Sequence, residues 1–309
     1  MEKQAKIYIA GHTGLVGRAL LRELKKEGYA NLLTRTHQEL DLTHQTEVER
    51  FFSQERPDYV FLAAARVGGI GANNSYPAEF IYENLMIQAN VINSAYTSGV
   101  KKLLFFSSAC MYPKYCPQPM KEDSLLTGCL ELTSEPYAIA KIAGVKMCEA
   151  YNRQYKTGFI CIIPSNIYGP DDHFGSQDSH VLPALIDKFH KAKIANEPSV
   201  IVWGSGNCKR EFIYVDDVAS AAIFLMNLFE IHSYVNLGYG EDITIKELIV
   251  AVKEIVGYKG EIVFDKSKPD GILRKALDSS RILSFGWKPK TSLASGLDKT
   301  YKSFLKKFS

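Results

Sequence analysis

Ile7-Tyr-Ile-Ala-Gly11-His-Thr-Gly14-Leu-Val-Gly17 decides the fold of this chain, because it runs directly into Arg18–Lys25, whose apolar residues have helical spacing. The order is a buried strand, a glycine turn and a helix. Glycines let the backbone turn tightly and approach a pyrophosphate, and the helix N-terminus offers free N–H groups to that anion. The stretch therefore predicts a dinucleotide site. A purely structural turn is the alternative, because the spacing is Gly-x-x-Gly-x-x-Gly rather than Gly-x-Gly-x-x-Gly.

The rest of the first half repeats the alternation of strand and helix. Apolar runs at Tyr59–Ala63, Lys102–Phe106 and Phe159–Ile163 alternate with helical patterns over Ala78–Ser98 and Ala138–Gln154. This order predicts an α/β fold, a Rossmann-type parallel sheet with helices on both faces.

After Pro164 the pattern loosens. A helix from about Val181, a strand over Val200–Trp203 and a helix over Ile245–Val256 are expected there. We expect residues 1–170 to form the dinucleotide-binding domain. Residues 171–309 would form mainly a smaller C-terminal α/β substrate lobe, with later segments returning to the first domain.

Composition narrows the function classes. The 309 residues are 46% apolar with a net charge of only +3 and no basic stripe interleaved with aromatic residues, which argues against nucleic acid as partner. No run of about 18 apolar residues and no signal-peptide pattern occurs, so we expect a cytoplasmic protein without membrane contact. The six cysteines form no Cys-x-x-Cys pair, so neither a metal site nor a disulfide framework is indicated.

Tyr137 and Lys141 stand four residues apart and so share one helix face. An ammonium group beside a phenol favours the ionised phenol and brings its pKa towards the range of a general acid or base. The apolar run that ends at Phe106 continues with Ser107-Ser-Ala-Cys-Met-Tyr112, which places hydroxyls and a thiol at the carboxyl edge of the sheet.

The glycine turn with the Tyr–Lys pair resembles the extended short-chain dehydrogenase/reductase family, whose fold binds a nicotinamide dinucleotide. Further strings across most of the chain are similar to one group within it, the GDP-L-fucose synthase family. They are Val67-Gly-Gly-Ile70, Glu135-Pro-Tyr-Ala-Ile-Ala-Lys141, Asn166-Ile-Tyr-Gly-Pro170, Ser179-His-Val-Leu-Pro183, Val202-Trp-Gly-Ser-Gly206, Arg210-Glu-Phe-Ile-Tyr-Val-Asp-Asp217 and Lys268-Pro-Asp-Gly271. Ser108 matches the position where the extended short-chain reductases place the serine that hydrogen-bonds the reacting carbonyl oxygen, and Ser107 is its competitor.

The resemblance implies an enzyme that epimerises C3 and C5 of GDP-4-keto-6-deoxy-D-mannose and then reduces the C4 ketone with NADPH. It assigns Cys110 as the base and His180 as the acid of epimerisation, while Tyr137 protonates the C4 oxygen. Without the resemblance, Cys110 would more often be a small buried residue and His180 a structural or surface histidine. A dehydratase would need a carboxylate pair where Ala109 and Cys110 stand, which disfavours dehydration.

NADP is the expected cofactor, because no acidic residue follows the second strand and Arg35 could meet a 2′-phosphate. Thr13 and His37 stand where relatives often carry arginine, so the charge complement is thin. The resemblance assigns a set of cofactor-binding residues: Gly11, His12, Thr13, Gly14, Leu15, Val16, Gly17, Arg35, His37, Asp41, Leu42, Ala63, Ala64, Phe106, Ser107, Ser108, Tyr137, Lys141, Pro164, Asn166, Ile167 and His180.

On the nucleotide-sugar side, the resemblance gives Lys188 and Arg210 to the diphosphate, Trp203 to the guanine or ribose, and Asp270 to a hydroxyl. Asn166 and the pair Val181 and Leu182 complete the expected pocket. The ordinary alternatives are a surface salt bridge for Arg210, a core position for Trp203 and a Pro-Asp-Gly turn for Asp270.

Relatives pair through the helix over Ala78–Ser98 and the helix that carries Tyr137, so a homodimer is expected. Two other functions stay open at this point. One is an epimerase or 4-ketoreductase for another nucleotide-activated deoxysugar or heptose. The other is a non-catalytic dinucleotide sensor, against which the intact Ser108, Tyr137 and Lys141 weigh.

Overall fold

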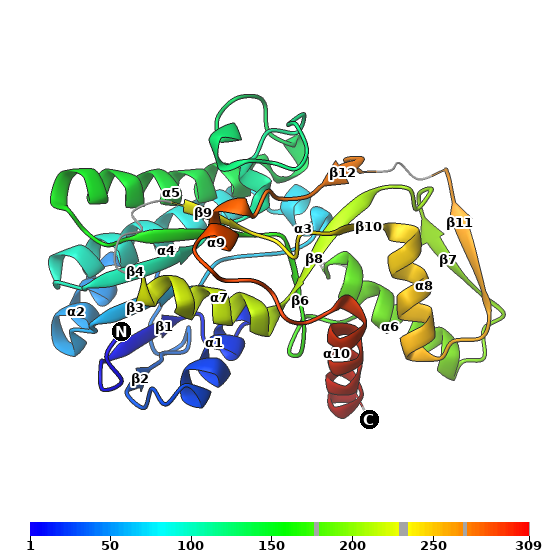
Figure 1. The fold of residues 1–309 in the computed structure, drawn as a ribbon, viewed down its shortest axis with the longest axis horizontal. Coiled ribbons are helices and arrows are strands. Elements are labelled where there is room, and N and C mark those ends of the chain that lie inside the picture. Colours follow the sequence, from blue (N-terminus) through cyan, green and yellow to red (C-terminus); the bar gives the residue numbers. More distant parts are fainter. Residues whose placement is uncertain (176–178, 229–233, 268–270, 309) are drawn as a thin grey trace.

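A six-stranded parallel sheet forms the centre of the larger lobe (Figure 1). The structure is a computed structural model and describes residues 1–175, 179–228, 234–267 and 271–308. The strand order of the six-stranded sheet is β2-β1-β3-β4-β5-β9. The strands are β1 (Ile7–Ala10), β2 (Leu32–Leu33), β3 (Tyr59–Leu62), β4 (Lys102–Phe106), β5 (Ile160–Pro164) and β9 (Tyr234–Leu237). The order reverses between β1 and β3, so the glycine turn lies where ligands bind in such sheets.

Helices cover both faces of this sheet, because its strands are buried on both sides. One face carries α1 (Leu15–Lys26) and α7 (Val215–Asn227), which pack on each other. The other face carries α2 (Gln45–Glu55), α4 (Pro77–Thr97) and α5 (Glu135–Tyr155). Two apolar clusters, one on each side of the sheet, form the core of the lobe. The expected fold class is confirmed, and α4 begins and ends one residue earlier than the pattern predicts.

The smaller lobe has its own core. It contains α6 (Val181–Ile194), α8 (Ile245–Val256) and α10 (Leu293–Phe308), packed on β7 (Ser199–Trp203) and β8 (Lys209–Tyr214). Strands β6 (Asn166–Tyr168), β10 (Asp242–Thr244) and β12 (Arg274–Lys275) each pair with β8, and β11 (Glu261–Asp265) pairs with β7. Shorter helices are α3 (Ile70–Ser75) and α9 (Ser280–Ser284).

The chain passes between the lobes more than once. After α6, β7 and β8 in the smaller lobe, α7 and β9 return to the larger lobe, and β9 pairs with β5 over Cys161–Pro164. The sixth strand of the larger lobe's sheet is therefore supplied from beyond residue 170.

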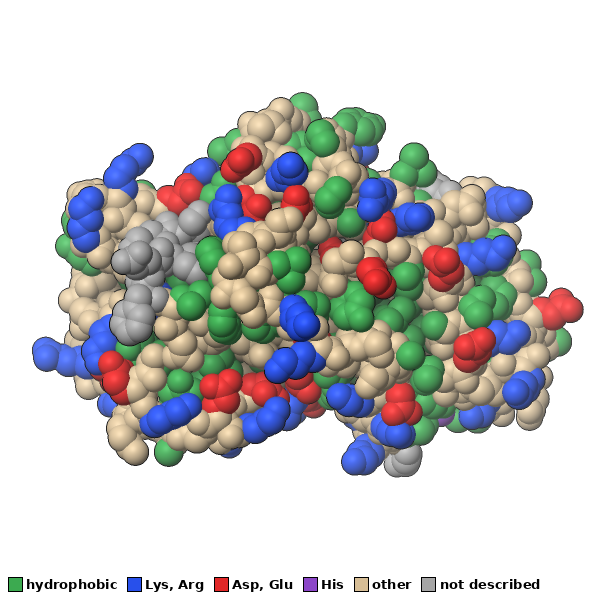
Figure 2. All heavy atoms as spheres, viewed as in Figure 1, with side chains coloured by type: hydrophobic (Ala, Val, Ile, Leu, Met, Phe, Trp, Pro, Cys, Tyr) green, Lys and Arg blue, Asp and Glu red, His purple; other side chains and the backbone are tan. Residues whose placement is uncertain are grey.

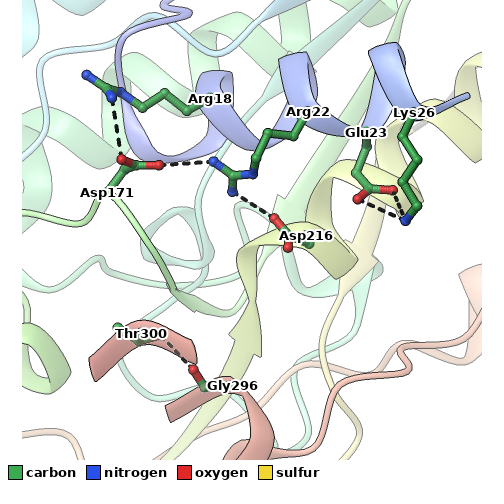
Figure 3. Close-up of polar contacts among 8 residues, drawn as sticks. All are labelled: Arg18, Arg22, Glu23, Lys26, Asp171, Asp216, Gly296 and Thr300. Carbon is green, nitrogen blue, oxygen red and sulfur yellow. Dashed lines mark hydrogen bonds and ion pairs between the residues drawn. The ribbon is translucent and has the colours of Figure 1, made fainter. Parts of the chain in front are cut away.

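An ion-pair network joins α1 to Asp171, which follows β6, and to Asp216, in the first turn of α7 (Figure 3). Arg22 contacts Asp171 at 3.0 Å and Asp216, at the start of α7, at 2.8 Å, and Arg18 contacts Asp171 at 3.4 Å. Asp171 takes a left-handed backbone with φ of 71°, which turns the chain after β6 back towards α1. The glycine-turn helix and the segment leading into α6 are thus tied together.

Charged side chains of both signs are interspersed over the face drawn in Figure 2. Within the part of the chain that the structure describes, no helix combines the length and the apolar character needed to cross a membrane.

Candidate active site

The glycine turn leaves no room for side chains at two positions. Gly11 has a φ of +84°, and a Cβ on it would lie 2.6 Å from the Ala64 amide nitrogen. A Cβ on Gly17 would lie 2.1 Å from the Gly11 carbonyl oxygen. A Cβ on Gly14 would meet only that oxygen, at 3.5 Å, which is ordinary contact. Gly14 is therefore open on the side away from the protein.

The N-terminus of α1 fits a pyrophosphate. Its first turn holds no acidic residue, and Gly14 caps it without a side-chain hydrogen bond. Free N–H groups and the positive end of the helix dipole therefore face outward at this turn. His12 lies in the same turn with a buried Nδ1 that has no hydrogen-bond partner in the described structure. An unpaired buried nitrogen is costly, so a bound polar group would satisfy it.

Alanine substitutions separate the folding role of this turn from its binding role. Gly17→Ala should lower stability by about 1–3 kcal/mol, because the new methyl group overlaps fixed backbone. Gly14→Ala should cost at most about 1 kcal/mol at a helix cap, yet weaken NADPH binding where the cofactor meets the turn. Thermal unfolding and NADPH fluorescence titration measure the two effects. Equal stability losses in the two variants would contradict this reading.

The loop after β2 holds its charges in pairs. The Arg35 guanidinium contacts Glu55 at 2.7 Å and lies over the Phe51 ring at 5.4 Å. His37 is exposed, and its Nδ1 lies 3.8 Å from the Asp41 carboxylate. A surface hollow contains His37 and Asp41 together with Arg66 and the first turns of α4. The candidate 2′-phosphate cation, Arg35, is thus already partly neutralised.

The remaining predicted cofactor residues lie along the carboxyl edge of the sheet. Ala63 and Ala64 follow β3 beside Gly11, and the Ala63 amide donates to the Ala10 carbonyl at 3.0 Å. Pro164 ends β5, and Ile167 lies in β6. Leu42 is buried, and its carbonyl accepts a hydrogen bond from Asn90 at 2.9 Å.

A cluster of polar side chains lies at the end of β4. Ser108 caps the short 3-10 helix Ala109–Met111, and its Oγ accepts from the Cys110 amide at 3.2 Å. Ser108 also lies close enough to Tyr137 of α5 for its side chain to lower the pKa of that phenol. The Ser107 hydroxyl instead turns inward and contacts Met111 Sδ at 3.3 Å. Of the two candidate serines, Ser108 is therefore the one beside the phenol.

The pKa values of Tyr137 and Lys141 differ from those that the sequence predicts. Burial raises the pKa of Tyr137 above its ordinary value, charge on Cys110 adds to the rise, and the Ser108 hydrogen bond opposes it. Burial also lowers the pKa of Lys141 to about 7. The Lys141 ammonium donates to the Phe106 carbonyl at 2.9 Å and lies 5.8 Å from the centre of the Tyr137 ring. The prediction that Lys141 lowers the phenol pKa is wrong for this structure, because Lys141 is desolvated and bonded elsewhere.

Cys110 lies in the same cluster and is half-buried. Its sulfur accepts a hydrogen bond from Lys275 Nζ at 3.5 Å. Burial alone would raise the pKa of the thiol, but the Lys275 charge and hydrogen bonds with Ser108, Lys275 and Ser134 outweigh it and lower the pKa. Lys275 was missed by the sequence reasoning. It lies 165 residues from Cys110, and no motif marks it.

His180 immediately precedes α6 and is exposed. Surrounding protein atoms and the charge of His173 lower its pKa. A lower pKa makes the imidazolium a stronger acid but leaves less of it protonated at neutral pH. In the described part of the chain, His180 shares no hydrogen bond with Ser108, Cys110 or Tyr137.

The predicted substrate residues are spread over the smaller lobe. Trp203 is 71% exposed, so it is not a core residue. Arg210 donates to the Ile272 carbonyl at 2.6 Å, and no carboxylate among the described residues pairs with it. Lys188 Nζ donates to the Ile201 carbonyl, which places it beside β7.

Other members of the substrate set lie closer to β8. The Asn166 amide donates to the Glu211 carbonyl at 2.8 Å. Val181 is 38% exposed, whereas Leu182 is buried in the lobe core. Asp270 falls outside the described residues.

The parallel sheet with its glycine turn and the cluster around Tyr137 define a class of dinucleotide-dependent enzymes. Residues 7–238 match the model of the NAD dependent epimerase/dehydratase family, and the chain belongs to that family. Within it, the chain is 57% identical to a putative GDP-L-fucose synthase 2 of Arabidopsis thaliana over 99% of this chain and 93% of that protein. It is 51% identical to the GDP-L-fucose synthase of Escherichia coli K12, with 99% and 98% covered.

A solved structure is similar as well. It is a GDP-mannoheptose C4 reductase from Campylobacter jejuni with NADP bound, 43% identical, with a TM-score of 0.90 and 99% of both chains covered. The match to the family model and the two GDP-L-fucose synthases supports the resemblance drawn from the motifs.

Proposed function

We propose that this protein converts GDP-4-keto-6-deoxy-D-mannose to GDP-L-fucose, by epimerisation at C3 and C5 followed by reduction of the C4 ketone. The observation that carries the proposal is the cluster of Ser108, Cys110 and Tyr137 at the end of β4, with a cation on the sulfur. The cluster combines a base with two hydroxyl donors for one oxygen. Relatives at 51–57% identity with the same activity in their names support it.

Epimerisation needs the proton on a carbon beside the ketone to leave as an enolate forms. The Cys110 thiolate takes this proton and becomes a thiol, while the electron pair of the C–H bond moves to the C4 oxygen. Hydroxyl donors from Ser108 and Tyr137 stabilise that oxygen charge. A proton from the His180 imidazolium, delivered to the opposite face of the carbon, completes the inversion.

NADPH supplies a hydride when it is bound. The glycine turn and the N-terminus of α1 would hold its pyrophosphate, as the space at Gly14 and the unpaired His12 nitrogen suit. Tyr137 donates its phenolic proton to the C4 oxygen as that oxygen gains charge. Its raised pKa keeps the proton in place at neutral pH until then.

Deuterated water tests both steps together. The protein is incubated with GDP-4-keto-6-deoxymannose and NADPH in D₂O, and the product is read by mass spectrometry and NMR. Label at both C3 and C5 with one NADPH oxidised per product is the expected result. NADPH oxidation without label at either carbon would leave a simple ketoreductase and contradict the proposal.

A second candidate is the same chemistry on a GDP-activated 4-keto-heptose. The similarity to a GDP-mannoheptose C4 reductase favours it. The two substrates differ at C6, so a competition between them under equal NADPH decides the case. A higher kcat/KM for the heptose would replace the first proposal.

NADPH is expected to be preferred over NADH, although only moderately. Arg35 is the candidate cation for the 2′-phosphate, and its ion pair with Glu55 weakens its attraction for that phosphate. We expect a kcat/KM ratio of about 10–100, or about 1.4–2.7 kcal/mol. Arg35→Met should reduce the ratio and Glu55→Gln should raise it, while Arg50→Met, on the exposed side of α2, serves as control. A wild-type preference for NADH would overturn the assignment.

We also propose a homodimer in the cytoplasm. Helices α4 and α5 pack side by side and expose Tyr82 and Ile139, at 61% and 42%. Apolar side chains on neighbouring helices suit a four-helix contact between two copies. All six cysteines are free, which suits a reducing compartment. Sedimentation of the wild type and of Ile139→Glu tests the dimer, and a monomeric wild type would refute it.

A further inference from the structure

We infer that Lys275 is a positioning residue for Cys110: its ammonium group holds the sulfur as the thiolate base at the edge of the substrate crevice. The inference rests on the proposed function, because it deepens the role of Cys110 in epimerisation. Its first support is the contact itself, 3.5 Å between Lys275 Nζ and Cys110 Sγ.

The backbone around Lys275 is fixed from two sides. Strand β12 pairs with β8, with Lys275 opposite Arg210. On the other side, the Ala276 amide donates to Gln118 Oε1 at 3.0 Å, and the Met120 amide donates to the Ala276 carbonyl at 2.8 Å. A two-residue strand held on both edges gives its lysine a defined direction.

A buried carboxylate also holds the backbone close to Lys275 in place. Glu211 is 1% exposed and accepts from the Leu277 amide at 2.8 Å and from the Gly240 amide at 2.7 Å. A Cβ on Gly238 would lie 2.1 Å from this carboxylate, so the packing is tight. The segment that follows Lys275 is thus fastened to β8 and to the end of β9.

Among the described residues, Lys275 has no carboxylate partner that competes with Cys110. Within that set, no carboxylate comes within ion-pair distance of its Nζ. Glu131 is close enough for the charge of Lys275 to act on it, but Glu131 pairs with Lys114 at 3.0 Å. The neighbouring Arg274 pairs with Asp242 at 2.6 Å, away from the thiol. Cys110 is therefore the group whose negative charge Lys275 is positioned to stabilise.

The other groups that face the Cys110 sulfur are hydroxyls. Ser108 comes from the end of β4, Ser134 from the turn before α5, and Tyr137 from α5 itself. Hydroxyls stabilise a thiolate by hydrogen bonding but bring no charge. Lys275 is thus the cation in this set, and an opposite charge at such a distance shifts an ionisation by about 1–3 pH units.

The test reads the ionisation of Cys110 directly. Iodoacetamide alkylates the thiolate, and peptide mass spectrometry follows modification of Cys110 as a function of pH. In Lys275→Met the midpoint should move to higher pH by about 1–3 units, because loss of the cation disfavours the thiolate. Lys275→Arg should keep the midpoint near wild type. Arg274→Met, on the same strand but paired with Asp242, is the matched control.

Turnover supplies the second readout. Exchange of the C3 and C5 protons in D₂O at pH 7 should fall at least about tenfold in Lys275→Met and recover as pH rises, since each pH unit multiplies the thiolate fraction by ten. A raised KM with an unmoved alkylation midpoint would overturn the inference and make Lys275 a substrate-binding residue. The alkylation needs no substrate, so a moved midpoint with no exchange in the wild type would refute the proposed function alone.

Discussion

Cys110→Ser should reduce hydrogen exchange at C3 and C5 by about 10²–10⁴-fold, the usual contribution of a positioned base. A serine hydroxyl is far less acidic than a thiol, so the Lys275 cation cannot keep it ionised at neutral pH. NADPH oxidation should fall in parallel where reduction waits for epimerisation. The measurement is label uptake in D₂O, followed by NMR.

Cys116→Ser is the matched control, because Cys116 is also a half-buried free thiol but lies in the loop beyond the 3-10 helix. It should exchange at the wild-type rate. A Cys110→Ser variant that exchanges as fast as wild type would remove Cys110 from the mechanism.

Tyr137→Phe should abolish reduction, with a loss of about 10²–10⁴-fold in NADPH oxidation, because the C4 oxygen loses its proton donor. Exchange at C3 and C5 should survive in part, since Cys110 and Ser108 remain. Single-turnover absorbance at the NADPH band gives the first rate, and label uptake gives the second.

Tyr155→Phe, on the same helix α5 and 42% exposed, is the control and should leave both rates unchanged. If Tyr137→Phe lowered exchange and reduction equally, the two steps would not have separate proton-transfer groups. Thermal unfolding of each variant separates these outcomes from loss of the fold.

Much of the architecture could be predicted, because its signals are local. In the glycine turn, a side chain at Gly11 or Gly17 would overlap neighbouring backbone, and the apolar runs match buried parallel strands. Ser108 and Tyr137 could be placed together because both lie at the carboxyl edge of the sheet. Strand ends moved by one residue and helix ends by up to three, as at α5, which begins at Glu135 rather than Ala138; local pattern does not determine such ends.

What could not be predicted depends on contacts between distant segments. Lys275 reaches Cys110 through the pairing of β12 with β8, and no feature of the sequence specifies that pairing. The pKa values of Tyr137 and Lys141 follow from burial, which outweighs the charge effect that their spacing suggests. Arg35 is predicted to meet a 2′-phosphate, but its ion pair with Glu55, from the far end of α2, could not be predicted.

Strand β9 is the last strand of the six-stranded sheet to be synthesised, which affects how the chain folds as it leaves the ribosome. A nascent chain that has emerged only through β6 contains five of the six strands of the sheet, and β5 then presents an open edge. Such an edge is a template for pairing with other chains. The smaller-lobe segments α6, β7 and β8 must leave the ribosome before β9 closes that edge. Between the emergence of β5 and that of β9, this edge is open to pairing with another chain.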